Sequence, residues 1–226
     1  MNVWPAILLS VQLAGLTMLI LLVIATPLAW WLTRTNSRAR PLIEAMVALP
    51  LVLPPTVLGF YLLVLMSPDM MLGAAWLRLT GDTLAFSFTG LLAASVIYSL
   101  PFAVQPLQTA FQSVGKGALE AATTLGAGPW DAFRSIVVPL SRRGFLTAMV
   151  LSFAHTLGEF GVVLMVGGNI PGKTRMISIE VFNAVETLDY TTAHQLSAGL
   201  LVFSFFVLVF VYVLNSQDRG KRRGTE

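Results

Sequence analysis

The chain of 226 residues has 56% hydrophobic and 11% charged residues, a balance that excludes an ordinary soluble domain and indicates a polytopic membrane protein with no nucleic-acid partner. It contains no cysteine, which excludes disulfides and thiolate metal sites. The net charge of +3 is small, so the placement of the charges is more informative than their sum.

Long apolar runs predict an all-α fold with five transmembrane helices in a single domain, residues 1–226. A helix needs about 20 apolar residues to span a bilayer, and residues 1–33 contain no charge at all. We expect spans at about 5–32, 42–66, 84–110, 145–166 and 196–214.

The second run contains three prolines and a glycine in the stretch LPLVLPPTVLG, residues 49–59. Proline removes a helix hydrogen bond, so this helix is predicted to be interrupted within the membrane. A broken helix at that depth either lines an aqueous path or is a packing kink. Pro54, Pro55 and Thr56 are therefore candidate pathway residues.

The basic residues predict the orientation, because cytoplasmic loops collect Lys and Arg. When the loops are assigned alternately, one side holds eleven of the fourteen basic residues and the other holds Arg78, Lys173 and Arg175. The first group consists of Arg34, Arg38, Arg40, Lys116, Arg134, Arg142, Arg143, Arg219, Lys221, Arg222 and Arg223. This predicts an N-terminus outside and a C-terminus in the cytoplasm.

A polar stretch at 112–143, on the predicted cytoplasmic side, interrupts the apolar runs. Residues 117–125 are rich in helix formers, and Gly126 can supply a left-handed helix end. Pro129 and Asp131 suit the first turn of a second short helix, and Pro139 is expected to close it. We call residues 112–143 the elbow, and we interpret it as a docking surface for a partner.

Residues 167–174, GGNIPGKT, match the phosphate-binding loop pattern of nucleotide hydrolases. That loop requires a preceding strand, whereas the apolar run here continues back to residue 145 and predicts a membrane helix. Its expected position on the outer side also separates it from cytoplasmic ATP. The sequence instead predicts an outer loop whose Gly168, Asn169, Gly172 and Lys173 contact a partner or attract an anion.

Glu159 lies in an apolar run, where an ionisable side chain is costly and is therefore a functional candidate. It either packs hydrogen-bonded against a neighbouring helix or belongs to a pore or gate. With His155 one turn earlier, it also raises the hypotheses of a proton-coupled transporter and of an intramembrane metal enzyme. We expect no metal site, because a site needs three or four ligands.

Hydroxyl groups in the apolar runs have two interpretations. They either offer weak contacts along a pathway or form hydrogen bonds between helices. The candidates are Thr56, Ser95, Ser99, Ser152 and Thr156. The outer stretch 174–188 carries apolar residues at helical spacing, and it is either a helix at the membrane surface or one packed on the core.

The elbow resembles the EAA signature of ABC importer permeases. The matching positions are Glu120, Ala121, Ala122, Gly126, Ile136 and Pro139. Val138 departs from the family pattern, which has Leu before the proline. The stretches ATPLAWWLTR, LPLVLPPTVLG and LGEFGVVLMVGGNIPGKT are similar to the molybdate and sulfate branch of these permeases, and GEFG followed by GNIPGKT is most similar to molybdate permeases.

This resemblance implies the membrane subunit of an oxyanion importer in a bacterial inner membrane, with molybdate as the expected substrate and sulfate or thiosulfate as the alternative. It also implies a homodimer, two cytoplasmic ATPase subunits that bind ATP and magnesium, and a periplasmic oxyanion-binding protein. The chain itself is then not an enzyme and binds no cofactor, and the elbow transmits motion from the ATPase.

Overall fold

The computed structural model describes residues 3–222, with side chains throughout except at Lys116 and residues 214–222. The regular structure in this range is helical, which confirms the all-α class. Three helices are long and apolar enough to cross a membrane, or up to five if each of two bent pairs is one span. The five-span division stays a prediction. Arg223 lies outside the described residues, as do the side chains of Lys116, Arg219, Lys221 and Arg222.

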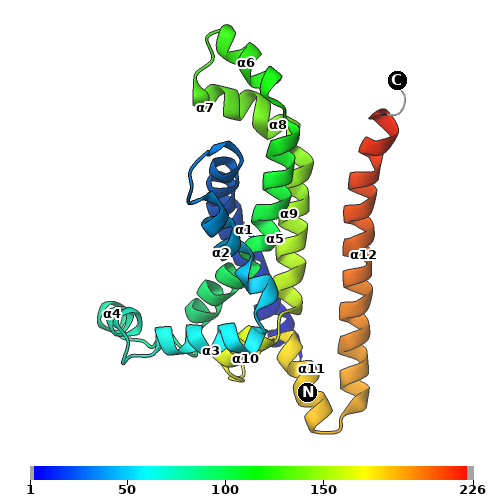
Figure 1. Cartoon of the computed structure of the whole chain (residues 1–226). Helices are drawn as coiled ribbons and strands as arrows, with labels where there is room; N and C mark the ends of the chain where they lie inside the picture. Colours follow the sequence, from blue (N-terminus) through cyan, green and yellow to red (C-terminus); the bar gives the residue numbers. More distant parts are fainter. Residues whose placement is uncertain (1–2, 223–226) are drawn as a thin grey trace.

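Three helices that pack against one another form the centre of the molecule: α1 (Trp4–Arg34), α5 (Phe88–Ser113) and α9 (Arg142–Gly158). Their contact faces carry small residues that are fully buried, namely Ala14, Ala25, Ala29, Ala103 and Ala148. Small side chains let membrane helices approach closely, where van der Waals contact stabilises them. In Figure 1, α5 and α9 run side by side along the long axis of the molecule.

The second predicted span is two helices, α2 (Arg40–Val52) and α3 (Pro55–Met66), which meet at a bend of 112°. The interruption lies at Leu53 and Pro54, as the prolines predict. Leu53 is extended, with φ −71° and ψ 137°, because a residue before proline avoids the helical region. Beyond the bend, α3 runs across the direction of α5 and α9 (Figure 1).

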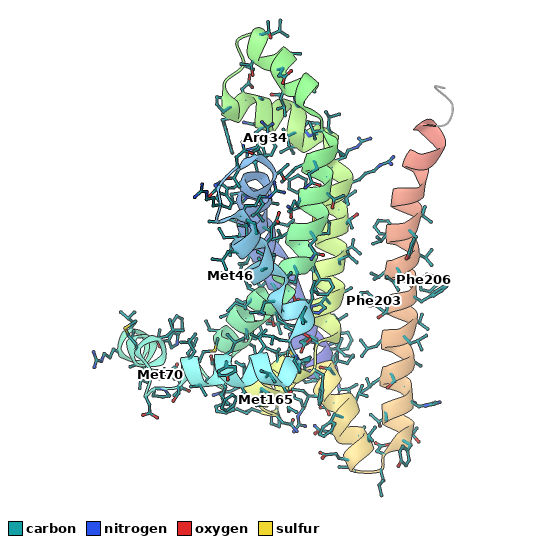
Figure 2. All side chains as sticks on the ribbon, viewed as in Figure 1. Arg34, Met46, Met70, Met165, Phe203 and Phe206 are labelled. Carbon is teal, nitrogen blue, oxygen red and sulfur yellow. The ribbon has the colours of Figure 1, made fainter. Side chains whose placement is uncertain are left out.

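The continuous helix expected over 145–166 is also two helices, α9 and α10 (Gly161–Gly167), separated at Glu159 and Phe160. The half-helices α3 and α10 pack against each other. A Cβ on Gly161 would lie 2.6 Å from the Cβ of Pro55, so glycine permits this approach. Met165, labelled in Figure 2, lies against Gly59 of α3 in the same crossing.

Two helix starts differ from the predicted spans because a side chain caps each helix. Ser87 Oγ accepts the Gly90 N–H at 3.0 Å, so α5 begins at Phe88. Asp189 accepts the backbone N–H of Thr192 at 3.1 Å, and α12 (Tyr190–Arg222) begins next to it. The side-chain hydrogen bond from Thr192, with its backbone hydrogen bond, also lowers the pKa of the Asp189 carboxyl.

The remaining short helices lie at the two ends of the bundle (Figure 1). The elbow forms α6 (Lys116–Thr124), α7 (Pro129–Ala132), the π-helix η1 (Phe133–Val137) and α8 (Val138–Leu140) at one end. The other end holds α4 (Met71–Thr80), α10 and α11 (Ile177–Glu186). The described chain begins at the α11 end, and α12 runs toward the end that carries the elbow.

Candidate functional site

The first half of the elbow ends in a hydrogen-bonded turn at Gly126. The Gly126 N–H donates to the Thr123 carbonyl and the Ala127 N–H donates to the Ala122 carbonyl, both at 3.0 Å. This pair of bonds is the Schellman motif, and it requires a left-handed residue at the position of Gly126, whose φ is +84°. The predicted helix end at this glycine is confirmed.

The second half of the elbow is a continuous helical run that ends one residue after Pro139, close to the predicted end. It begins at Pro129 as predicted, passes through the π-helical turn η1 and continues past Pro139 to Leu140. The wider turn of a π-helix accommodates a local irregularity in hydrogen bonding. This run then meets α9 at a 70° bend.

An aromatic cluster attaches the second half of the elbow to the helix bundle. The indole of Trp30, on α1, lies edge to face with Phe133 of η1 and with Phe111 of α5, at centroid distances of 5.1 and 5.6 Å. Phe111 also meets Phe145 of α9 at 5.8 Å. Phe111 also meets Phe133 at 6.0 Å, and because aromatic pairs of this geometry are stabilising beyond their buried area, these contacts join η1 to α1 and α5.

Three large apolar side chains of the elbow are exposed, among exposed polar and charged residues such as Asp131 and Arg134. The exposed fractions of Leu125, Trp130 and Leu140 are 89%, 73% and 61%. Trp130 stacks on Phe133, with 5.8 Å between the ring centroids, which connects the exposed surface to the aromatic cluster. Large exposed apolar side chains within one short segment are typical of a protein-binding surface.

The six predicted coupling residues differ in exposure. Four are exposed: Glu120, Ala121, Gly126 and Pro139. Ala122 is 7% exposed, and Ile136 packs on the apolar core. The EAA positions therefore serve both the outer surface of the elbow and its attachment.

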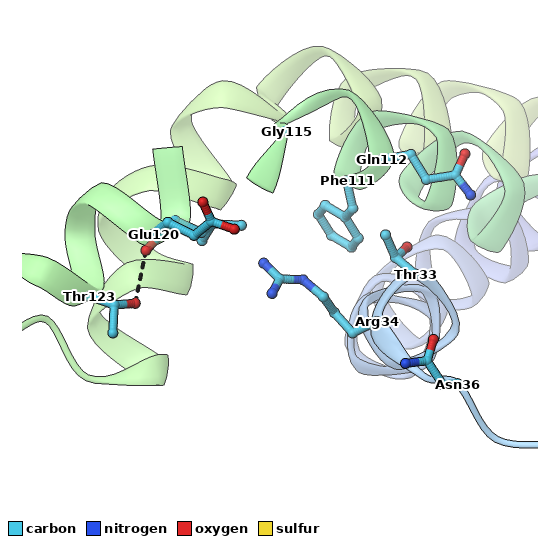
Figure 3. A pocket seen from close by; sticks show the side chains of 9 residues that line it. Thr33, Arg34, Asn36, Phe111, Gln112, Gly115, Glu120 and Thr123 are labelled. Atoms are coloured by element: carbon cyan, nitrogen blue, oxygen red, sulfur yellow. Dashed lines mark hydrogen bonds between the residues drawn. The ribbon is translucent and has the colours of Figure 1, made fainter. Parts of the chain in front are cut away.

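A pocket of about 500 Å³ separates α6 from the ends of α1 and α5 (Figure 3). Arg34 enters it from α1, and its guanidinium carbon lies 4.3 Å from the centroid of the Trp30 ring. Figure 3 shows Glu120 on the facing wall. The remaining lining residues are Thr33, Asn36, Phe111, Gln112, Gly115, Leu119 and Thr123.

Three of the four hydroxyl candidates within the bundle form hydrogen bonds between or within helices. Ser152 Oγ donates to the Ala148 carbonyl at 2.7 Å, and Thr156 Oγ1 donates to the Ser152 carbonyl at 2.9 Å. Ser99 Oγ lies 2.9 Å from Thr156 Oγ1. Ser95 Oγ is buried and makes no hydrogen bond within the described part of the chain.

The same network includes His155. Ser99 Oγ lies 3.0 Å from His155 Nδ1, within hydrogen-bond distance. The imidazole stacks on Phe102 at 3.9 Å between centroids, so His155 joins α9 to α5 and does not pair with Glu159.

Glu159 occupies the break between α9 and α10, where it acts as a helix cap. Its Oε1 accepts the Val162 N–H at 2.9 Å, and its carbonyl accepts the Ser178 hydroxyl at 2.6 Å. A carboxylate near the unpaired amides of a helix start is stabilising. These bonds favour the structural interpretation of this residue. Among the described residues, no group of three or more His, Asp or Glu is arranged to hold a metal ion.

Of the other pathway candidates, Pro54 and Thr56 are exposed at the bend between α2 and α3, whereas Pro55 is half-buried against Gly161. The exposed fractions of Ser152, Thr156 and Glu159 are 0%, 3% and 8%. The fold thus brings the two helix breaks together but leaves only Pro54 and Thr56 of this set accessible.

The loop at 167–174 does not have the geometry of a phosphate-binding loop. It follows helix α10 rather than a strand, and the N–H groups of Lys173, Thr174 and Arg175 all donate to the Ile170 carbonyl. Asn169 holds the loop to α11 through a 2.7 Å hydrogen bond to Asn183. Gly172 and Lys173 remain exposed, so the loop presents an ordered surface.

The outer stretch 174–188 contains a helix, α11, but its predicted apolar stripe does not form the buried face. The buried residues are Ile179, Glu180 and Ala184, and the exposed ones include Phe182, Val185 and Leu188. Glu180 is oriented inward by an ion pair with Arg175 at 3.5 Å. The helix packs on α1, α9 and α12, with Ile179 fully buried, while much of the apolar stripe is exposed. The position of this stripe at a membrane surface stays a prediction.

Trp30, Arg34, Phe111 and Phe133 are the residues at this site that pattern reasoning did not single out. Trp30 and Arg34 lie in ATPLAWWLTR, which carried part of the family resemblance. The available signal was a tryptophan and an arginine one helical turn apart, at the end of a predicted span.

Comparison with known proteins shows which family the chain belongs to. A model of the family described as "Binding-protein-dependent transport system inner membrane component" matches residues 22–222. The chain is 58% identical over 207 residues, 92% of each chain, to the Molybdenum transport system permease protein ModB of Azotobacter vinelandii. It is 33% identical over 190 residues, 84% of this chain and 68% of the relative, to the Sulfate transport system permease protein CysT of Escherichia coli K12.

A solved structure shows the same fold. One chain of the crystal structure of a bacterial alginate ABC transporter, in complex with an alginate pentasaccharide-bound periplasmic protein, superposes with a TM-score of 0.72 at 17% identity. The match covers 92% of this chain and 76% of that chain. The chain therefore belongs to the inner membrane components of binding-protein-dependent transport systems, as a non-catalytic permease subunit of an ABC transporter.

Proposed function

We propose that this chain is the membrane subunit of an ATP-driven molybdate importer. The elbow carries the mechanistic part of the proposal, because it combines large exposed apolar side chains with aromatic contacts to α1 and α5. The substrate is supported by the 58% identity to a molybdenum permease, against 33% to a sulfate permease. Sulfate or thiosulfate is the alternative substrate.

In the proposed complex, two copies of the chain form a homodimer around a central path. Each elbow inserts into a groove of a cytoplasmic ATPase subunit, which binds ATP and magnesium, and a periplasmic binding protein delivers the oxyanion. The elbow and the C-terminus then lie in the cytoplasm and the N-terminus lies outside. Two observations support this orientation: the distribution of basic residues, and the position of the first described residues at the end opposite the elbow.

The elbow can couple the ATPase to the membrane helices because some of its side chains are exposed and others pack on the bundle. Leu125 and Trp130 are largely exposed, so a moving partner can contact them. Trp130 stacks on Phe133, and Phe133 contacts Trp30, so a displacement at the surface reaches α1 through packed rings. Closely packed contacts transmit displacement because interiors are nearly incompressible.

The pathway is proposed to lie along the exposed bend at Pro54 and Thr56. Pathway groups that bind weakly suit a transporter, because tight binding within the membrane traps the substrate. Ser152, Thr156 and Glu159 hold helices in place around this region. On the outer side, the ordered loop with Gly168, Asn169, Gly172 and Lys173 is proposed to contact the binding protein, where Lys173 also attracts an anion.

Transport in proteoliposomes that contain the chain, its co-encoded ATPase and the binding protein tests this function. The proposal predicts ATP-dependent molybdate uptake that an excess of sulfate does not reduce. If sulfate competes equally, the substrate assignment is wrong and the sulfate alternative holds. The docking role of the elbow is tested by copurification of the ATPase and by uptake, with the native chain and with a Leu125→Ser and Trp130→Ser double variant. If the native chain does not copurify with the ATPase, and the double variant matches it in both measurements, the docking role is wrong.

A further inference from the structure

We propose that Arg34 is a positioning residue for coupling, and that it forms an ion pair with Glu120 when α6 moves toward α1 and the pocket between them narrows. This inference rests on the proposed function, in which the ATPase moves the elbow. It assigns a role to a residue outside the EAA signature.

Arg34 is already oriented for such a pair. It is the last residue of α1, where a cation interacts favourably with the helix dipole. Its guanidinium lies over the face of Trp30, and Trp30 is held between Phe111 and Phe133. The planar guanidinium still presents N–H donors toward the pocket. Because its side chain is already held in place, forming an ion pair costs little additional conformational entropy.

Glu120 is on the more weakly attached half of the elbow. The helix α6 reaches the apolar core through Leu119, whereas the second half contributes Phe133, Ile136 and the fully buried Val137. At both ends of α6 the chain passes through a glycine with positive φ, which marks a sharp change of direction. A force on the elbow is therefore expected to displace α6 relative to η1.

The pocket provides the space for this displacement. Arg34 and Glu120 project into it from opposite walls (Figure 3), and no ion pair joins them within the described part of the chain. Phe111 and Leu119 form an apolar part of the wall, so a closed pair is less screened than one in open water. Because both side chains retain solvent contact, the pair biases the closed position by up to about fivefold rather than locking it.

Distance measurement tests the movement without altering either charge. The chain has no cysteine, so Asn36→Cys and Thr123→Cys introduce two unique sites for spin labels on opposite walls of the pocket. In the assembled transporter, the label distance should shorten when the complex is trapped with ATP and vanadate, relative to the nucleotide-free state. An unchanged or longer distance overturns the proposal.

Charge variants test the role of the pair. Arg34→Gln should lower uptake per ATP hydrolysed by up to about fivefold, and Arg34→Lys should retain most of it. Arg38→Gln is the matched control, because Arg38 is exposed on the same segment but does not line the pocket. If Arg34→Gln matches Arg38→Gln, the inference is wrong.

Failure of this inference is distinguishable from failure of the proposed function. The native complex reports on the function through ATP-dependent uptake, whatever the Arg34 variants do. If Arg34→Gln does not fold, the spin-label distances, measured with Arg34 and Glu120 in place, decide the question.

Discussion

The indole of Trp30 meets the phenyl ring of Phe133 at 5.1 Å between centroids, with 63° between the ring planes. Trp30 belongs to α1 and Phe133 to η1, so this edge-to-face contact connects the elbow directly to a long helix of the bundle. The same indole contacts Phe111 on α5. A single side chain thus links the elbow to two helices.

Replacing Trp30 with Ala should destabilise the chain and uncouple the elbow. Core Phe or Trp to Ala substitutions cost about 3 to 5 kcal/mol, and Trp30, which is half-buried, belongs near the lower end. Thermal unfolding in detergent and uptake per ATP measure the two effects. The neighbouring Trp31 is 39% exposed, so Trp31→Ala should lower stability and uptake per ATP less. Equal losses in the two variants would show that the contact of Trp30 with Phe133 is not required for coupling.

Gly126→Ala should strain the turn of the elbow. The left-handed conformation costs a residue with a Cβ about 1 to 2 kcal/mol, and the surroundings are open, so backbone strain is the only penalty. Copurification of the ATPase with the chain is the measurement, and we expect it to weaken. Gly117→Ala is the control: this glycine is helical and open, so alanine should be neutral or stabilising by up to about 1 kcal/mol. If Gly117→Ala weakens copurification of the ATPase and Gly126→Ala does not, strain at the turn is not the cause.

Glu159→Gln should preserve transport, because a glutamine oxygen can still accept the Val162 N–H that caps α10. Glu159→Ala removes the acceptor and should cost about 1 kcal/mol of stability. Uptake and thermal unfolding of the two variants separate the roles. A proton-coupled mechanism requires the opposite order, with Glu159→Gln inactive although it is stably folded.

Gly161→Ala should disrupt the crossing of α3 and α10. The added Cβ would lie 2.6 Å from the rigid ring of Pro55, and overpacking of this kind costs about 1 to 3 kcal/mol. Gly158 in the same GEFG stretch has open space around it, so Gly158→Ala tests the neighbouring position without a clash. Thermal unfolding in detergent should separate the two variants, and equal unfolding temperatures would mean that the half-helices do not depend on this contact.

The sequence predicted the elbow and the first helix break because both depend on local chemistry. Gly126 marks a left-handed helix end through its lack of a Cβ, and the consecutive prolines at 54 and 55 interrupt hydrogen bonding wherever they occur. The EAA spacing then identified the surface that carries Glu120 and Ala121. Such signals need no knowledge of the tertiary neighbours.

The break at Glu159 and the aromatic cluster depend on contacts that are distant in sequence. No proline marks the end of α9, and the break is stabilised by Ser178 of α11, which bonds to the Glu159 carbonyl. Trp30, Phe111 and Phe133 lie on three separate elements, and nothing in the sequence around each one indicates that they meet. At α11, periodicity predicted the helix, but it did not indicate that Glu180, paired with Arg175, would lie on the buried face.

ATP dependence tests the central claim most directly, because the claim is that the energy for transport enters through the elbow from a separate ATPase. Molybdate uptake should be measured in proteoliposomes with the full complex, with and without ATP, and with a protonophore that collapses the proton gradient. We predict uptake that requires ATP and persists with the protonophore. Uptake that proceeds without ATP and stops when the protonophore is added would contradict the claim.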